Sequence, residues 1–125
     1  MKLQRVNIKQ AELLKEKEFD WECTYYYRKW YNEIQLREDH SSNFNSWIKT
    51  VEPFEDLCSA PSIQFALKWF RDVKGIPNGI YPLTNACSYI YRFWEYNGSL
   101  QTSFTYNSHE EAESALLDEL LKLEI

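Results

Sequence analysis

The segment from Ala60 to Gly75 constrains the fold more than any other part of the sequence. We expect Pro61 at the first helical position, where its missing N–H leaves no bond unmade, and Gly75 just past the C-terminus of the helix. At 100° per residue, the apolar side chains between them form one arc: Ile63, Phe65, Ala66, Leu67, Trp69, Phe70 and Val73. This arc is wider than the ~100° stripe of a surface helix. The segment therefore predicts a central core helix over residues 61–74.

Two further helices are predicted from their start signals. Asn7, with Gln10 three positions later, has the pattern of a capping box and indicates a helix over about residues 8–18. Ser108 and Glu111 form an S-x-x-E capping box before a leucine-rich stretch without Gly or Pro. That stretch predicts a helix over about residues 109–123.

Residues 23–37 are rich in aromatic and β-branched side chains, which favour β-strands. We expect two strands there, with a turn at Asn32-Glu33. The polar stretch 39–43 is the most loop-like in the chain. Short strands are expected around residues 45–51, where Trp47, Ile48 and Val51 lie, and near residues 79–83.

Asn97-Gly98 is the strongest short-range signal, because this pair between strand-like runs is typical of a two-residue type I′ hairpin. In that register Tyr96 lies opposite Ser99. One face, expected in the core, pairs Tyr89 with Tyr106, Tyr91 with Phe104 and Phe93 with Thr102. The other face projects three candidate binding residues together: Arg92, Trp94 and Tyr96.

The architecture predicted from these elements is α+β, one domain over residues 1–125. It has an antiparallel sheet with the Asn-Gly hairpin in its C-terminal half and about three helices packed mainly on one face. Hydrophobic residues make up 44% of the 125, with only 3 Gly and 4 Pro, which excludes disordered classes. No apolar run approaches the ~20 residues of a membrane span, and no apolar stretch follows Met1-Lys2 as in a secretory signal. We therefore expect a cytoplasmic protein.

Charge is concentrated at the C-terminus. The formal net charge is −5, and the last 18 residues hold six acids against Lys122 alone. These acids suit either the solvated face of a helix or a docking surface for a basic partner. An acidic chain lacks the basic stripe that nucleic-acid binding requires, so this class of partner is not expected.

Catalytic and metal-binding signatures are missing from the sequence. Cys23, Cys58 and Cys87 are too far apart for a zinc knuckle and odd in number, so we interpret them as reduced, buried thiols. His40 and His109 are interpreted as surface residues rather than metal ligands. The glycines are too scattered for a phosphate loop, and no G-x-S-x-G elbow is present. We predict no catalytic residue, no metal and no cofactor.

Two segments resemble motifs of a known group. Ala60-Pro61-Ser62-Ile63-Gln64-Phe65-Ala66-Leu67-Lys68-Trp69-Phe70-Arg71-Asp72-Val73-Lys74-Gly75-Ile76 is similar to an "APxxxxLxxWLRxxxGI" helix. The stretch from Tyr106 to Glu113 and the leucines after it are similar to a "YxTYEEAExxxLxxxLxLI" tail. Both occur in short, uncharacterised proteins encoded by phages and prophages of gut bacteria, and the resemblance runs from about Asp20 onward. It implies a phage-borne cytoplasmic protein of a bacterial host, without assigned activity or catalytic residues.

The aromatic content, 5 Trp, 9 Tyr and 7 Phe, is the feature that bears most on function. The first hypothesis is a non-enzymatic phage accessory protein that binds a host or phage macromolecule, for example to inhibit host defence. Trp, Tyr and Arg are common anchors of such interfaces. The alternatives are a small-ligand-binding or enzymatic domain with an aromatic-lined pocket, and a self-associating structural or assembly component.

Overall fold

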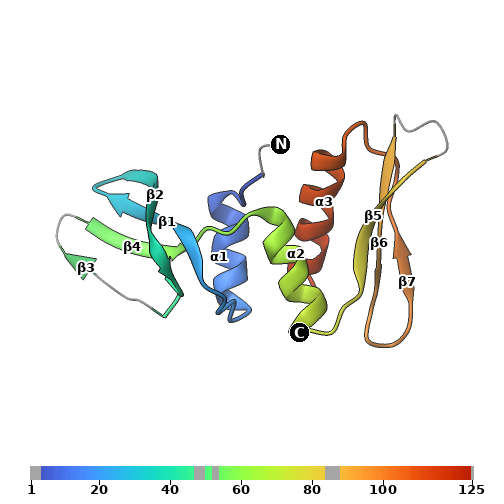
Figure 1. Cartoon of the computed structure of the whole chain (residues 1–125), viewed down its shortest axis with the longest axis horizontal. Coiled ribbons are helices and arrows are strands. Elements are labelled where there is room, and N and C mark those ends of the chain that lie inside the picture. The colour runs from blue at the N-terminus through green and yellow to red at the C-terminus, as the bar shows by residue number, and fades with distance from the viewer. Residues whose placement is uncertain (1–3, 47–49, 52–53, 84–87, 125) are drawn as a thin grey trace. The chain divides into compact units, whose positions relative to one another are not determined.

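The computed structural model describes residues 4–46, 50–51, 54–83 and 88–124. The fold is α+β, as predicted, and its strands are all antiparallel (Figure 1). They form two sheets rather than the single sheet expected, one with the strand order β2-β1-β4-β3 and one with the order β5-β6-β7. The chain divides into two compact units. The N-terminal unit is Arg5–Ser62, and the C-terminal unit is Ile63–Ile125 with Met1–Gln4. A single domain over residues 1–125 stays a prediction.

In the N-terminal unit, helix α1 (Ile8–Glu16) begins as its start signal predicts. The Asn7 side chain accepts from the Gln10 amide at 2.8 Å, and the Gln10 side chain accepts from the Asn7 amide at 3.0 Å. Two amides that the first helical turn leaves without partners are thereby satisfied. The helix packs on strand β4, where Lys15 Nζ donates to the Leu57 carbonyl at 2.6 Å.

Strands β1 (Cys23–Trp30) and β2 (Glu33–Ser42) form the expected hairpin. Its turn is Tyr31-Asn32 rather than the predicted Asn32-Glu33, because Glu33 already pairs with Trp30. The polar stretch 39–43 is not the predicted loop, because β2 continues to Ser42, which pairs with Cys23. Pairing with a neighbouring strand here overrides the local turn preference of Asp39 and His40. Strand β3 (Thr50–Val51) lies within the predicted strand at 45–51, whose Trp47 and Ile48 fall outside the described residues.

Strand β4 (Phe54–Ser59) has no counterpart among the predicted elements. Its acidic residues Glu55 and Asp56 give it a weak local strand signal. It nevertheless pairs along β1, from Phe54 opposite Trp30 to Ser59 opposite Tyr26. The long-range partner, and not the segment itself, makes it a strand.

In the C-terminal unit, helix α2 (Ile63–Asp72) is central, as its wide apolar arc predicts. Its buried side chains are Ile63, Ala66, Leu67, Trp69 and Phe70. The helix begins two residues after Pro61, so the prediction of proline at the first helical position is wrong. The Pro61 carbonyl instead accepts from the Val6 amide, and the Ile63 amide donates to the Gln4 carbonyl at 2.8 Å.

The end of α2 follows the prediction. Gly75 has a φ of +69°, a left-handed conformation that glycine adopts without strain. The Ile76 amide then donates to the Phe70 carbonyl at 3.0 Å, which closes the last turn. This turn leads the chain into strand β5 (Asn78–Pro82).

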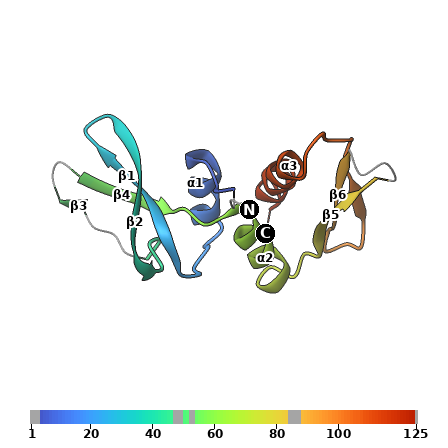
Figure 2. The same ribbon diagram turned by 45° about the horizontal axis from the view of Figure 1, so that its top comes forward.

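Strands β5, β6 (Tyr89–Trp94) and β7 (Leu100–Thr102) form the second sheet, and helix α3 (His109–Leu121) follows them. The Ser108 side chain caps α3 by accepting from the Glu111 amide at 3.1 Å. Figures 1 and 2 both show α2 and α3 on the same side of this sheet. The sheet of the C-terminal unit therefore has one face covered by helices.

The hairpin at Asn97-Gly98 exists, but its register differs by one residue from the prediction. Trp94 pairs with Leu100, and the Glu95 amide donates to the Ser99 carbonyl at 2.9 Å, so the loop has three residues. The Gly98 amide donates to the Glu95 carbonyl, and within the loop only Gly98 has a positive φ, +85°. A type I′ turn needs positive φ at both central residues, whereas a type I turn followed by a glycine bulge needs it at one. The loop therefore matches the type I turn with a bulge at Gly98.

Farther from the turn, Tyr89 and Tyr106 form the expected pair through two hydrogen bonds of 2.8 Å. The predicted core residue Phe104 is instead 91% exposed. Tyr91 stacks on Phe93 and on Tyr106, with ring centroids 6.2 and 6.1 Å apart. The inner face of the sheet is therefore closed by Tyr91, Phe93 and Tyr106, without Phe104.

The observed turn makes a specific prediction for the loop. Replacing Gly98 by Ala should lower the free energy of unfolding by about 1–2 kcal/mol, because a Cβ disfavours positive φ. Replacing Asn97 by Ala should cost less, since Asn97 has no such backbone constraint. Urea denaturation of the two variants measures the difference. Equal losses would indicate the type I′ turn.

Candidate functional site

One face of the β5-β6-β7 sheet points away from the helices, and two of the candidate binding residues lie on it. Side chains alternate along β6. Tyr91 and Phe93 are buried on the helix-covered face, so Arg92 and Trp94 belong to the other. Leu100, opposite Trp94, shares that face and is 47% exposed.

Tyr81 of β5 extends this face toward Arg92. A Cβ built on Gly79 would lie 3.4 Å from the Tyr81 hydroxyl, so the tyrosine side chain folds over the glycine. The Arg92 guanidinium lies 5.1 Å from the centroid of the Tyr81 ring, within the range of a cation–π contact. Glycine at position 79 thus leaves room for the ring that Arg92 contacts.

Arg92 has no anionic partner within the described part of the chain. Its Nε atom is buried and makes no hydrogen bond. An aromatic ring offsets part of the cost of taking an arginine's charge out of water, but it does not accept the hydrogen bonds of the guanidinium N–H groups. Those groups are best satisfied by a bidentate oxygen acceptor such as a carboxylate. The Tyr81 ring is therefore the charge-related contact that the described residues give to Arg92.

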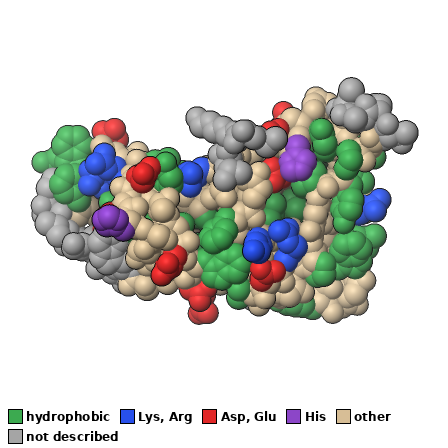
Figure 3. All heavy atoms as spheres, in the orientation of Figure 1, with side chains coloured by type: hydrophobic (Ala, Val, Ile, Leu, Met, Phe, Trp, Pro, Cys, Tyr) green, Lys and Arg blue, Asp and Glu red, His purple; other side chains and the backbone are tan. Residues whose placement is uncertain are grey.

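We call Tyr81, Arg92, Trp94 and Leu100 the outer sheet patch. Figure 3 shows hydrophobic side chains along the part of the molecule formed by β5, β6 and β7. Within the patch Trp94 and Arg92 are half-buried, while Tyr81 and Leu100 are more exposed. The patch is an apolar surface with a single charge.

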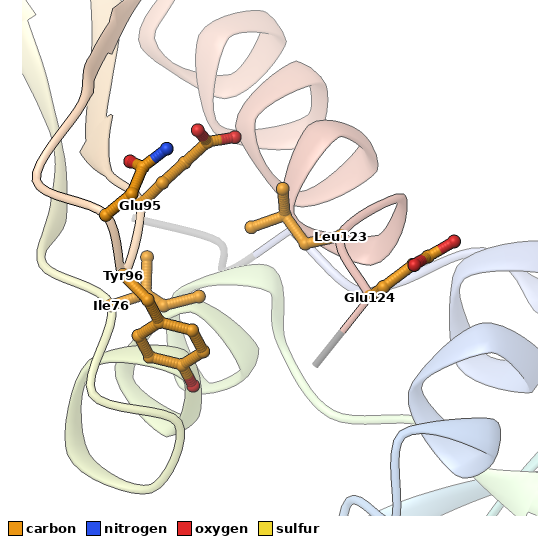
Figure 4. A pocket seen from close by; sticks show the side chains of 6 residues that line it. Ile76, Glu95, Tyr96, Leu123 and Glu124 are labelled. Atoms are coloured by element: carbon orange, nitrogen blue, oxygen red, sulfur yellow. The ribbon is translucent and has the colours of Figure 1, made fainter.

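Tyr96 does not join Arg92 and Trp94, which corrects the expected arrangement. It lies in the three-residue loop, and its hydroxyl donates to the Lys74 carbonyl just after α2. There it borders a pocket of about 260 Å³ that Ile76 and Leu123 also line, on the helix side of the sheet (Figure 4). Sequence reasoning missed Tyr81 and Leu100, because their place on the patch follows from strand pairing that only the structure gives.

A polar cluster, separate from the outer sheet patch, lies between α2, β5 and α3 of the C-terminal unit. It lines a pocket of about 160 Å³ and includes Gln64, Arg71, Asn78, His109 and Glu113. His109 Nδ1 lies 3.0 Å from Glu113 Oε1, and Gln64 Nε2 donates to the same oxygen at 3.2 Å. His109 is a surface residue, as expected, but it is held in place by a buried carboxylate.

The described cysteines lack the features of nucleophiles. Burial raises the pKa of the Cys58 thiol to about 12, and burial also raises the pKa of Cys23. Cys58 is buried, as expected, whereas Cys23 is half-buried, and Cys87 lies outside the described residues. A thiol that stays protonated at neutral pH attacks electrophiles slowly.

Comparisons with protein-family models, curated proteins and solved structures found no match for this chain. Within the described residues, every helix is too short or too polar to cross a bilayer. The described side chains also contain no group of three or more His, Cys, Asp or Glu placed to hold a metal ion.

Thiol protection gives a direct test of the N-terminal core. At pH 8 the native protein should react with iodoacetamide at Cys58 at least tenfold more slowly than the urea-unfolded protein, because burial disfavours the thiolate. Peptide mass spectrometry follows each cysteine separately. Equal rates in the folded and unfolded protein would contradict a buried thiol.

Tyr91 predicts a loss of stability at alkaline pH. Its burial, aided by the nearby Glu119 and Tyr106, raises its pKa to about 12 from 10.0. The folded state thus favours the neutral phenol, and the free energy of unfolding should fall as the pH rises from 10 to 12. Tyr91→Phe should show a flatter dependence over this range in urea denaturation. Parallel curves for the two proteins would refute this effect.

Proposed function

We propose that this chain is a non-enzymatic binding protein that contacts a protein partner through the outer sheet patch. The unpaired Arg92 guanidinium beside Trp94 is the observation that carries the proposal. Tryptophan and arginine are the residues most enriched among the energetic anchors of protein interfaces. Their juxtaposition on one open sheet face supports an interface at this position.

The chemistry of the patch favours a particular kind of partner surface. A carboxylate of the partner would supply the acceptor that Arg92 lacks, and its desolvation between Tyr81 and Trp94 would strengthen the pair. An apolar partner residue would cover Leu100, which is largely open to solvent. The patch therefore suits an acidic residue flanked by an apolar one.

Nucleic acid fits this surface less well. Its affinity arises from neutralising several phosphates, whereas the patch contains the single cation Arg92 on a chain of net charge −5. The aromatic side chains could stack on bases, but stacking without a basic groove gives weak binding. A protein partner is consistent with both the charge and the exposed apolar area.

The resemblance to phage and prophage proteins extends the proposal to a biological setting. We propose an accessory protein that acts in the cytoplasm of a bacterial host and binds a host or phage macromolecule, for example a component of host defence. The resemblance rests on residues 60–76 and on the segment from Tyr106 onward. It supports this setting by analogy.

Two substitutions test the patch. Trp94→Ala and Arg92→Glu should each abolish recovery of a partner captured from bacterial lysate by the tagged wild-type chain. Both should leave the free energy of unfolding nearly unchanged, because both side chains are half-buried on an open face. Quantitative mass spectrometry of captures with the tag at either end measures the recovery.

Tyr31→Asn is the matched control, because Tyr31 is exposed on the other unit and Asn tolerates its positive φ. The control should retain the partner. A loss of several kcal/mol in Trp94→Ala would show instead that this face is ordinary core. Light scattering could show that the wild-type chain self-associates and that Trp94→Ala does not. In that case the patch is a homodimer interface, and the proposal of a different protein as partner is wrong.

A further inference from the structure

We infer that the pocket between α2, β5 and α3 binds a compact organic cation, a primary ammonium or a guanidinium group. This pocket is separate from the outer sheet patch, and the inference does not depend on the proposed function. Its lining comes from three elements of the C-terminal unit and has a volume of about 160 Å³. The chemistry of its oxygen atoms identifies the ligand class.

Glu113 provides the central negative charge. Its residue is only 3% exposed, and a carboxylate that leaves water needs strong compensation. The structure supplies two contacts, from His109 and Gln64, and both go to Oε1. No described residue donates to the second oxygen, Oε2. A donor from outside the chain would complete the site.

Gln64 adds a second unsatisfied acceptor. Its Nε2 is used on Glu113, while its Oε1 is buried and has no hydrogen-bond donor. Buried acceptors of this kind are rare in folded proteins, because each loses its bonds to water without replacement. Gln64 and Glu113 thus place two acceptor oxygens without a described donor beside one pocket, where they favour a ligand with several N–H donors.

His109 completes the acceptor set. His109 Nδ1 lies against Glu113 Oε1, which leaves Nε2 as the ring nitrogen without a partner in this contact. The edge of the Tyr89 ring packs against the imidazole, with centroids 5.6 Å apart at 81°, and helps to fix its orientation. An ammonium group has three donors for these acceptors, whereas a neutral alcohol has one.

Arg71, the cation that also lines the pocket, does not neutralise Glu113. It is seven residues from Gln64 on α2, about 10 Å along the helix axis, and it donates to Asn78 Oδ1 at 2.9 Å. A metal ion is a poorer fit than an organic cation, because the site offers one carboxylate and two neutral groups. The small volume also limits the ligand to a few heavy atoms beyond its charged group.

The experiment uses n-propylammonium as the probe and 1-propanol as its neutral counterpart of the same size. Amide NMR spectra of the full chain should shift on addition of the ammonium, with the changes confined to residues near Gln64, Asn78 and Glu113. The alcohol should cause at most a tenth of that response at equal concentration. Added salt should weaken ammonium binding, since the attraction is electrostatic.

Glu113→Gln should weaken binding of the probe about tenfold or more, because it removes the charge while keeping the side-chain shape. Glu110→Gln, an exposed change on the same helix, is the matched control and should bind as the wild type does. If Glu113→Gln fails to fold, Gln64→Ala takes its place. Equal shifts from both probes, shifts spread over the acidic surface, or unchanged binding in the variants would overturn the inference and leave a purely structural Glu113–His109 pair.

Discussion

Trp69 and Phe70 lie next to each other on α2, with ring centroids 5.2 Å apart at 80°, and neither reaches solvent. Adjacent helical residues point in directions about 100° apart. A helix that buries both must therefore be covered on more than one side. In the C-terminal unit α3 and β5 provide this cover, and the turn at Gly75 brings β5 back along the helix. The burial of these two rings thus determines how the remaining elements of the unit are placed.

This arrangement explains why the two candidate sites have different character. The helices cover one face of the β5-β6-β7 sheet, and antiparallel sheets commonly leave the other face to solvent. Trp94 and Arg92 lie on the open face, where a large partner can reach them. Glu113 lies on α3 among packed elements, where only a small group can enter. Exposure therefore favours a macromolecule at one site and a compact ligand at the other.

Much of the fold was predictable because its signals are local. The cap at Asn7, the cap at Ser108 and the left-handed glycine at position 75 each depend on bonds within a few residues of the chain. Strand β4 was not predictable, since Glu55 and Asp56 are poor strand formers that pair only because β1 lies beside them. For the same reason the strand β2 extends through a segment whose residues favour a loop.

The sequence by itself determined the α+β class, the three helices and the presence of a hairpin at Asn97-Gly98. Helical periodicity, capping and turn preference depend on residues that are close together in the chain. Only the tertiary structure decided the hairpin register, and with it the separation of Tyr96 from Trp94. A turn of two or three residues has nearly the same local signal, and the pairing of Arg92, Phe93 and Trp94 with β7 selects the three-residue loop. The contact of Glu113 with Gln64 was likewise decided by packing, since it joins residues 49 positions apart.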